Sequence, residues 1–286
     1  GLEIKDYIDS AGSGATATLS AGSATDQPAP DMAAFSSRGP NGAAGDVIKP
    51  DVTAPGVVVL AGASPTPLLG APGQLFQAIS GTSMSSPHTA GVGALLAQLH
   101  PTWTPAMIKS ALMTTGDQDV FKEDGSTPAD PFDLGGGHIA PNPAADPGLV
   151  YDAGFDDYLR FLCGAGALSG CGAIAIDPSD LNLASIAVDG LAGAQTVTRT
   201  VTNAGAAGTY AVTTEDPAGI TVGVEPQLLN LDEGETATYE ITFTSTPGAV
   251  LDEWAFGSLT WSDGTHNVRS PIAVKPIALA FPAAFA

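Results

Sequence analysis

The sequence predicts an α/β domain over residues 31–176, followed by an all-β sandwich over residues 177–286. In the first range, short apolar runs bounded by Gly and Pro alternate with helical patterns, which is typical of α/β proteins. From about Asp180 the apolar period becomes two, and about seven strand-like runs follow, which suits a two-sheet sandwich. With 286 residues, 44% of them apolar, the chain can form both parts.

Residues 1–30 precede both parts. A short amphipathic piece runs from Leu2 to Ile8, and the remainder is Gly, Ser, Ala and Thr with almost no large apolar side chain. We expect this range to be a linker or the end of a preceding domain. The apolar runs Met32–Phe35 and Val57–Leu60 are the first strand candidates of the α/β domain.

Two helices are expected next. The first begins near Ser83 and continues to Leu99, and its small and apolar residues on all sides predict a buried helix. Pro87 is acceptable there because it falls in or near the first turn. The second helix has Thr104 as N-cap and Pro105 as its first residue, which predicts an ordinary outer helix.

A third helix is expected from Asp156 to Cys163. Cys163 and Cys171 enclose seven residues and could form a disulfide in an oxidising compartment or stay reduced, so the sequence leaves their state open. The run Gly135–Gly137 lacks the preceding strand and the Lys of a phosphate-binding loop, and we expect a flexible turn.

A two-residue alternation along the sequence predicts the strands of the sandwich. Val197, Arg199 and Val201 alternate with threonines, and so share one face of a strand. Further strands are expected at 209–213, 220–224, 239–243, 256–261 and 268–274.

The charge excludes two classes of partner. The net charge of −21 divides into −11 over residues 1–176 and −10 over residues 177–286, and Lys and Arg form no cluster. Nucleic acids and anionic membrane surfaces require basic patches, so neither is an expected partner. The longest apolar stretch, residues 91–99, is too short to span a bilayer.

No cofactor or metal site is expected. The acidic residues are scattered, and the sequence has no His-Glu-x-x-His motif, no calcium loop and no Cys/His ligand spacing. The acidic turn at 232–235 is expected to be a solvated loop. Asn-x-Ser/Thr sequons are absent.

Ser83 stands where a tight loop turns into a helix. At that place the hydroxyl is presented at the end of an element, and the unpaired N–H groups and the positive end of the helix dipole can stabilise a nearby anion. Both features serve acyl transfer. A Ser at a helix start is far more often only an N-cap, so this position alone does not identify a nucleophile.

The longer segment GTSMSSPHTAGVGALL resembles the nucleophile signature of the subtilisin-like serine peptidases, in which the Ser after Gly-Thr is the nucleophile. That residue is Ser83 here, and its backbone N–H is expected to contribute to the oxyanion hole. The segments AAFSSRGP (33–40) and KPDVTAPGV (49–57) resemble two motifs that precede this signature in the same family. The resemblance implies that residues 31–176 are the C-terminal part of a doubly wound, largely parallel sheet.

Further motifs indicate which kind of subtilisin-like peptidase the chain resembles. The cucumisin-like subtilases have segments similar to three stretches of this sequence, GGGHIAPNPAADPGLVYD, TVTRTVTNAG and GITVGVEP. These enzymes carry a fibronectin-III-like C-terminal domain, which is what residues 177–286 are expected to form. Residues 5–8 resemble the end of the protease-associated domain that such enzymes insert before the SSRGP segment.

The family's triad Asp, triad His and oxyanion-hole Asn precede the inserted domain, and no matching motifs occur in this sequence. His88 is five residues after Ser83 on the helix and points away from it. His100, His138 and His266 are expected to be structural. Because a serine without a base is a poor nucleophile, we expect the isolated chain to be inactive and residues 31–176 to expose apolar surface.

The sequence therefore predicts part of a secreted serine endopeptidase. Its expected substrates are proteins or peptides, and its further expected partner is the missing upstream catalytic segment. One alternative is a non-catalytic pseudoenzyme or protein-binding module. Another is one half of a nicked or truncated enzyme that regains activity with its N-terminal partner. The acidic balance suits secretion, a saline setting or basic substrates. Cleavage preference and oligomeric state do not follow from the sequence.

Overall fold

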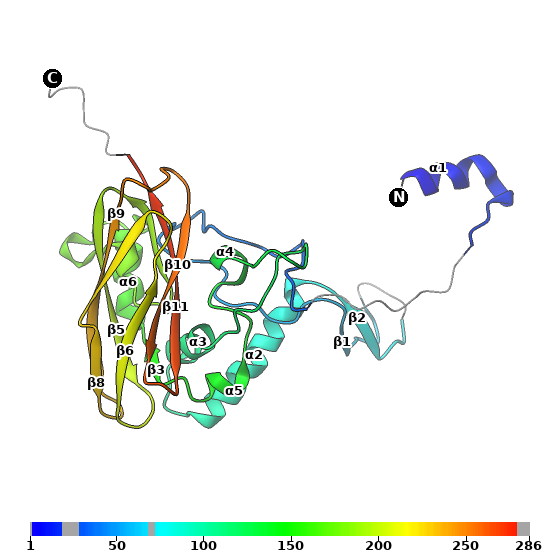
Figure 1. Ribbon diagram of the computed structural model, residues 1–286. Coiled ribbons are helices and arrows are strands. Elements are labelled where there is room, and N and C mark those ends of the chain that lie inside the picture. Colours follow the sequence, from blue (N-terminus) through cyan, green and yellow to red (C-terminus); the bar gives the residue numbers. More distant parts are fainter. Residues whose placement is uncertain (1, 19–28, 68–71, 279–286) are drawn as a thin grey trace, which may run out of the picture.

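The computed structural model describes residues 2–18, 29–67 and 72–278 (Figure 1). Residues 1, 19–28 and 279–286, which belong to the ranges 1–30 and 177–286 above, lie outside the described residues. The amphipathic N-terminal piece forms helix α1 (Leu2–Ala11), followed by the short 3-10 helix η1 (Gly12–Gly14). Residues 3–10 are all exposed.

Among the described residues of the first part of the chain, five further helices form, and three coincide with those expected from the sequence. Thr104 caps α3 as expected, because its hydroxyl oxygen accepts the N–H of Met107 at 3.1 Å. The capping box of α4 pairs Asp130 with Asp133. The helices are α2 (Thr82–Leu99), α3 (Pro105–Thr114), α4 (Pro131–Leu134), α5 (Pro141–Ala144) and α6 (Phe155–Gly164), and the 3-10 helices η2 (Gly172–Ile174) and η3 (Pro178–Asp180) follow them.

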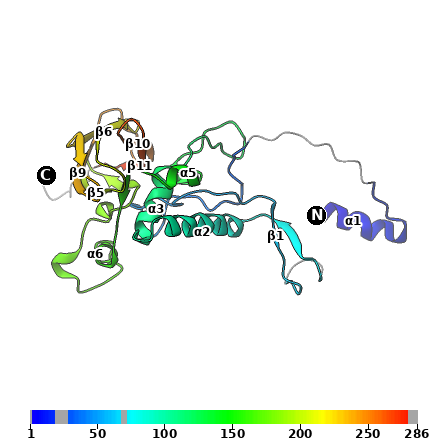
Figure 2. The same cartoon turned by 90° about the horizontal axis from the view of Figure 1, so that it is seen from below.

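The described residues of this part of the chain form few strands. β1 (Val59–Gly62) and β2 (Phe76–Ile79) form an antiparallel hairpin that projects from the body (Figure 2). Parallel pairing within the described part of residues 31–176 is limited to single bridges, from Thr53 to His138 and from Asp31 to Phe121. A doubly wound sheet is assembled around central strands, and without such strands the flanking segments have no ladder to join.

The C-terminal part is a two-sheet sandwich, as expected. One sheet has the order β4-β11-β10-β6-β8 and the other β3-β5-β9-β7. The strand β3 (Leu149–Tyr151) comes from the preceding range and pairs antiparallel with β5. The remaining strands are β4 (Ile186–Leu191), β5 (Ala194–Asn203), β6 (Gly208–Glu215), β7 (Ile220–Glu225), β8 (Leu228–Leu231), β9 (Thr236–Ser245), β10 (Ala255–Ser262) and β11 (Asn267–Pro276).

Arg199 is the largest charged side chain in the sandwich core and is 2% exposed. Its guanidinium donates to the backbone carbonyls of Ser179 at 2.8 Å, Leu183 at 3.1 Å and Ser185 at 3.1 Å. A buried charge is tolerated when its donors are paired, and here the pairs fasten the segment that enters the sandwich to β5.

The two parts share a packed interface. Phe132 of α4 makes edge-to-face contacts with Trp254 and Phe256 of the sandwich, with ring centroids 5.1 and 5.0 Å apart. Met113 of α3 lies in the sandwich core cluster. The sandwich therefore supports α3 and α4 directly.

The expectation of a flexible turn at Gly135–Gly137 is wrong. All three glycines are buried, and Gly135 has a φ of +64°. A Cβ at Gly135 would lie 2.3 Å from the carbonyl oxygen of Pro50, and one at Gly136 would lie 2.5 Å from that of Met113. Three backbone segments cross here, so only glycine fits. Cys163 and Cys171, whose state the sequence left open, form a disulfide.

Candidate active site

The turn that leads into α2 is fixed by backbone contacts. The N–H of Gly81, the N-cap of α2, donates to the carbonyl of Gly56 at 2.8 Å, and the N–H of Met84 donates to the carbonyl of Gly81 at 2.9 Å. One residue earlier, the hydroxyl oxygen of Ser80 accepts the N–H of Val58 at 2.8 Å. The segment around Gly56 therefore determines where α2 begins.

Ser83 is the second residue of α2 and is exposed. Within the described residues its hydroxyl makes no hydrogen bond. Its backbone N–H belongs to the first turn, whose N–H groups have no partner inside a helix, and the helix dipole places positive charge there. The geometry thus offers a free hydroxyl beside an anion-stabilising helix terminus, while the nucleophilic role of Ser83 and the oxyanion role of its N–H stay predictions.

The four histidines contact groups other than Ser83. Nδ1 of His88 lies 2.8 Å from the carbonyl oxygen of Met84, along the helix axis. His100 stacks on Trp103, with ring centroids 3.8 Å apart, and caps the end of α2. The backbone of His138 forms bridges to neighbouring segments, and His266 lies in the sandwich. Among the described residues, none of these rings is bonded to Ser83.

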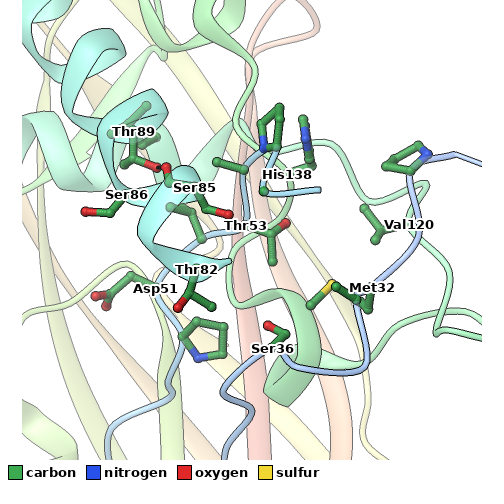
Figure 3. Close-up of a pocket in the computed structure, with 18 of the residues that line it drawn as sticks. Met32, Ser36, Asp51, Thr53, Thr82, Ser85, Ser86, Thr89, Val120 and His138 are labelled. Carbon is green, nitrogen blue, oxygen red and sulfur yellow. Dashed lines mark hydrogen bonds between the residues drawn. The ribbon is translucent and has the colours of Figure 1, made fainter. Parts of the chain in front are cut away.

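A cavity of about 920 Å³ adjoins the first half of α2. Its walls come from residues 29–37, residues 50–57, α2 and α3, and His138 also contributes. Figure 3 shows Thr82, Ser85 and Thr89 of α2 along one wall, with Thr53 and Met32 on the other side. Parts of the three segments that the sequence analysis singled out therefore line the cavity together with α3, whereas Ser83 itself is not among the lining residues.

Asp51 connects one cavity wall to α3. Its carboxylate lies 2.7 Å from Nζ of Lys109 and 2.5 Å from Nζ of Lys49. Burial raises the pKa of Asp51, but the two ammonium groups outweigh burial and hold the pKa below its ordinary value. The carboxylate is thus charged at neutral pH and already neutralised, which suits a structural role.

Helix α2 itself is poorly covered. Of its 18 residues only Leu96 is buried, while Leu95 and Leu99 are 63% and 58% exposed. The side chains of Phe76 and Leu60, in the hairpin beyond the cavity, are 66% and 71% exposed. The expectation that residues 31–176 expose apolar surface is confirmed, whereas the predicted burial of α2 is wrong for this chain because no element covers most of the helix.

No group of three or more His, Cys, Asp or Glu side chains among the described residues is arranged to hold a metal ion. None of the described helices is long and apolar enough to cross a membrane.

Sequence reasoning missed Gly56, Ser80 and the cavity. Gly56 lies within the KPDVTAPGV segment, so the motif pointed to the right place without giving a role for this glycine. The contact of Ser80 could not be found, because a Ser beside Gly81 has many possible acceptors and donors. The cavity depends on tertiary packing that no local pattern encodes.

Comparison with known proteins agrees with these observations. Residues 6–166 match the subtilase family, and residues 180–274 match the fibronectin type-III domain. The chain is 44% identical over 272 residues to Subtilisin-like protease SBT5.3 of Arabidopsis thaliana, covering 87% of this chain and 35% of that protein. It is 44% identical over 277 residues to Subtilisin-like protease SBT1.7 of the same plant, covering 87% and 36%.

A soybean relative gives the same result. Subtilisin-like protease Glyma18g48580 of Glycine max is 42% identical over 281 residues, again covering 87% of this chain and 35% of the relative. The chain thus spans about a third of the length of these relatives. With a family match over more than half of its residues and a fibronectin type-III domain after it, the chain belongs to the subtilase family.

Proposed function

We propose that this chain is the nucleophile-bearing part of a serine endopeptidase, with Ser83 as nucleophile. The observation that carries the proposal is the exposed hydroxyl of Ser83 in the first turn of α2, which makes no hydrogen bond to any described residue, within the GTSMSSPH segment of a subtilase. The Oγ atom attacks the carbonyl carbon of a peptide bond, and a base takes its proton. The amine leaves with a proton, and water then hydrolyses the acyl-enzyme.

The backbone N–H of Ser83 stabilises the oxyanion in this proposal. Its place at the positive end of α2 supports that role, because a fixed donor aimed at developing charge lowers the barrier. The base, the Asp that orients it and a second oxyanion donor come from a polypeptide upstream of this chain.

Three observations support a need for that upstream polypeptide. The cavity beside α2 is unfilled by this chain, α2 is largely exposed although it carries no Asp, Glu, Lys or Arg and is rich in small and apolar residues, and the chain spans about a third of its relatives. A helix of small and apolar residues without a charged face is normally covered by protein. We infer that the upstream segment packs against α2 and completes both the sheet and the catalytic set, so the isolated chain is inactive.

Secretion is part of the same proposal. The bond between Cys163 and Cys171 supports an oxidising compartment, since such bonds are rare where thiols are kept reduced. The substrates are proteins or peptides, in keeping with the printed names of the relatives.

Labelling with a fluorophosphonate, which reacts with activated serines, tests the proposal. The chain is labelled alone and after addition of the segment of SBT5.3 that precedes the aligned region, with Ser83→Ala as control. We expect labelling only of the completed protein and only with Ser83 present. Labelling of the isolated chain would mean that it contains its own base. Absence of labelling in a completed, folded protein would favour a pseudoenzyme or binding module.

A further inference from the structure

Two histidines hold consecutive residues of the loop that leads from α5 into β3. Nε2 of His100, the C-cap of α2, lies 2.8 Å from the carbonyl oxygen of Ala145. The carboxylate of the next residue, Asp146, lies 3.3 Å from Nε2 of His266, which belongs to the turn between β10 and β11. The loop at Ala145 and Asp146 thus connects the C-terminal end of α2 to the sandwich.

The ring of His266 is oriented from its own side by Asp263. One carboxylate oxygen of Asp263 accepts the backbone N–H groups of Thr265 at 2.8 Å and His266 at 2.6 Å, and the other lies 2.8 Å from Nδ1 of His266. With Nδ1 engaged in this way, Nε2 is left to meet Asp146. The pairing is therefore built into the hairpin rather than made by a freely rotating side chain.

Gly148, in the loop, packs closely against His266 and leaves no room for a side chain between them. A Cβ at Gly148, which has a φ of +79°, would lie 2.9 Å from both Cβ of His266 and the hydroxyl oxygen of Tyr210. Among the described residues, the titratable groups that face His266 are Asp263 on its own turn, Asp146 on the loop and Tyr210 on β6. Burial and the two nearby carboxylates raise the pKa of Tyr210 to about 12, so this phenol stays neutral through the range in which a histidine titrates.

We propose that His266 and Asp146 form a proton-dependent latch that fastens the sandwich to the loop holding the end of α2. Protonated imidazole donates from both nitrogens, to Asp263 and to Asp146 at once. Neutral imidazole carries one N–H and satisfies one carboxylate only. The switching element is the loop from Ala145 to Gly148, which His100 ties to α2.

The direction of the pH dependence follows from the same contacts. The hydrogen bond to Asp263 raises the pKa of His266, burial offsets part of this effect, and Asp146 raises the pKa further. A raised pKa contributes stability that is complete below the ordinary value of 6.5 and is lost as the pH rises through the folded-state value. The latch is thus closed in acid and opens in alkali, whether or not Ser83 is a nucleophile.

An NMR titration of the four histidine rings in the whole chain tests the latch, with Asp146→Asn and Asp119→Asn as matched variants. Both aspartates are exposed and both changes remove one negative charge. We expect the titration midpoint of His266 to fall in Asp146→Asn and to stay in place in Asp119→Asn. An unchanged midpoint in Asp146→Asn would overturn the proposal, as would an equal fall in both variants.

Thermal unfolding gives a second readout. The melting temperature of Asp146→Asn should lie below that of the wild type at pH 5.5, and the difference should vanish as His266 deprotonates at higher pH. Amide exchange in the last turn of α2 should quicken in this variant at pH 5.5. A difference in melting temperature that is the same at pH 5.5 and pH 9 would mean a contact that does not depend on the proton, and would overturn the latch.

Discussion

The N–H of Gly81 and the carbonyl oxygen of Gly56 are joined by a hydrogen bond of 2.8 Å, two residues before Ser83. This bond connects the KPDVTAPGV segment to the start of α2. The approach is close, because a Cβ at Gly56 would lie 2.3 Å from Oγ of Ser85 and 3.0 Å from the carbonyl oxygen of Gly81. The position of Ser83 therefore depends on a segment some thirty residues earlier in the chain.

Gly56→Ala is expected to displace the turn before Ser83. The added methyl group overpacks the site, and overpacking costs about 1–3 kcal/mol in free energy of unfolding, measured by urea denaturation. Adding Ser85→Ala removes the nearest contact, so the double variant should recover part of the loss. Gly91→Ala, in α2 with no atom within 4 Å of the added Cβ, serves as control and should not destabilise. Equal losses in the single and double variants would contradict the packing argument.

Gly135→Ala is expected to be among the most damaging substitutions. Its Cβ would lie 2.3 and 2.5 Å from the carbonyl oxygens of Pro50 and Asp51, which are backbone atoms and cannot rotate away, and its φ is +64°. We expect a loss of roughly 3–5 kcal/mol in free energy of unfolding. Gly166→Ala, with a φ of +72° and open space around it, isolates the cost of backbone strain, about 1–2 kcal/mol. Similar losses at both glycines would show that crowding at Gly135 is unimportant.

Local patterns predicted much of this fold. The N-cap at Thr104, the helix from Ser83 to Leu99 and the alternation around Arg199 all depend on neighbours in sequence, and the structure confirms them. The three-glycine run was misjudged because its role depends on Pro50 and Met113, which are distant in sequence. The turn at Ser83 was located from its motif, but its ties to Gly56 and Ser80 depend on tertiary packing.

Arg199→Met is expected to destabilise the sandwich strongly. The methionine leaves the buried carbonyls of Ser179, Leu183 and Ser185 without their donors, and each unpaired buried acceptor costs about 1–3 kcal/mol. Arg160→Met, at an exposed position on α6, should change the free energy of unfolding by less than about 0.5 kcal/mol. Urea denaturation at pH 7 compares the two. A small effect at Arg199 would mean that water replaces its hydrogen bonds.

Asp133 should contribute to acid unfolding. This buried carboxylate lies 2.8 Å from Nζ of Lys122 and 3.0 Å from Nε of Arg38. Burial raises its pKa, but Lys122, the backbone N–H of Asp130 and Arg38 outweigh burial and leave the pKa below its ordinary value of 3.8. The stability from these contacts is present above that value and is lost as the pH falls through the lower, folded-state pKa.

Asp133→Asn tests the direction of this pH dependence of stability. The variant should be less stable than the wild type at pH 7, and the difference should shrink as the pH falls below about 4. Urea denaturation at pH 7, 4 and 3 measures it, with the exposed Asp119→Asn as control for charge. A difference that grows toward low pH would contradict the assignment of Asp133 as a charged, paired group.

The most direct test of the central claim is the site of the fluorophosphonate adduct in the completed protein. The chain is combined with the upstream segment of SBT5.3, labelled, digested and mapped by mass spectrometry, with Ser85→Ala and Ser86→Ala beside Ser83→Ala. Our account predicts one adduct per chain, on Ser83, which forms only when the upstream segment is present and persists in the Ser85 and Ser86 variants. An adduct on another serine, or equal labelling of the isolated chain, would contradict it.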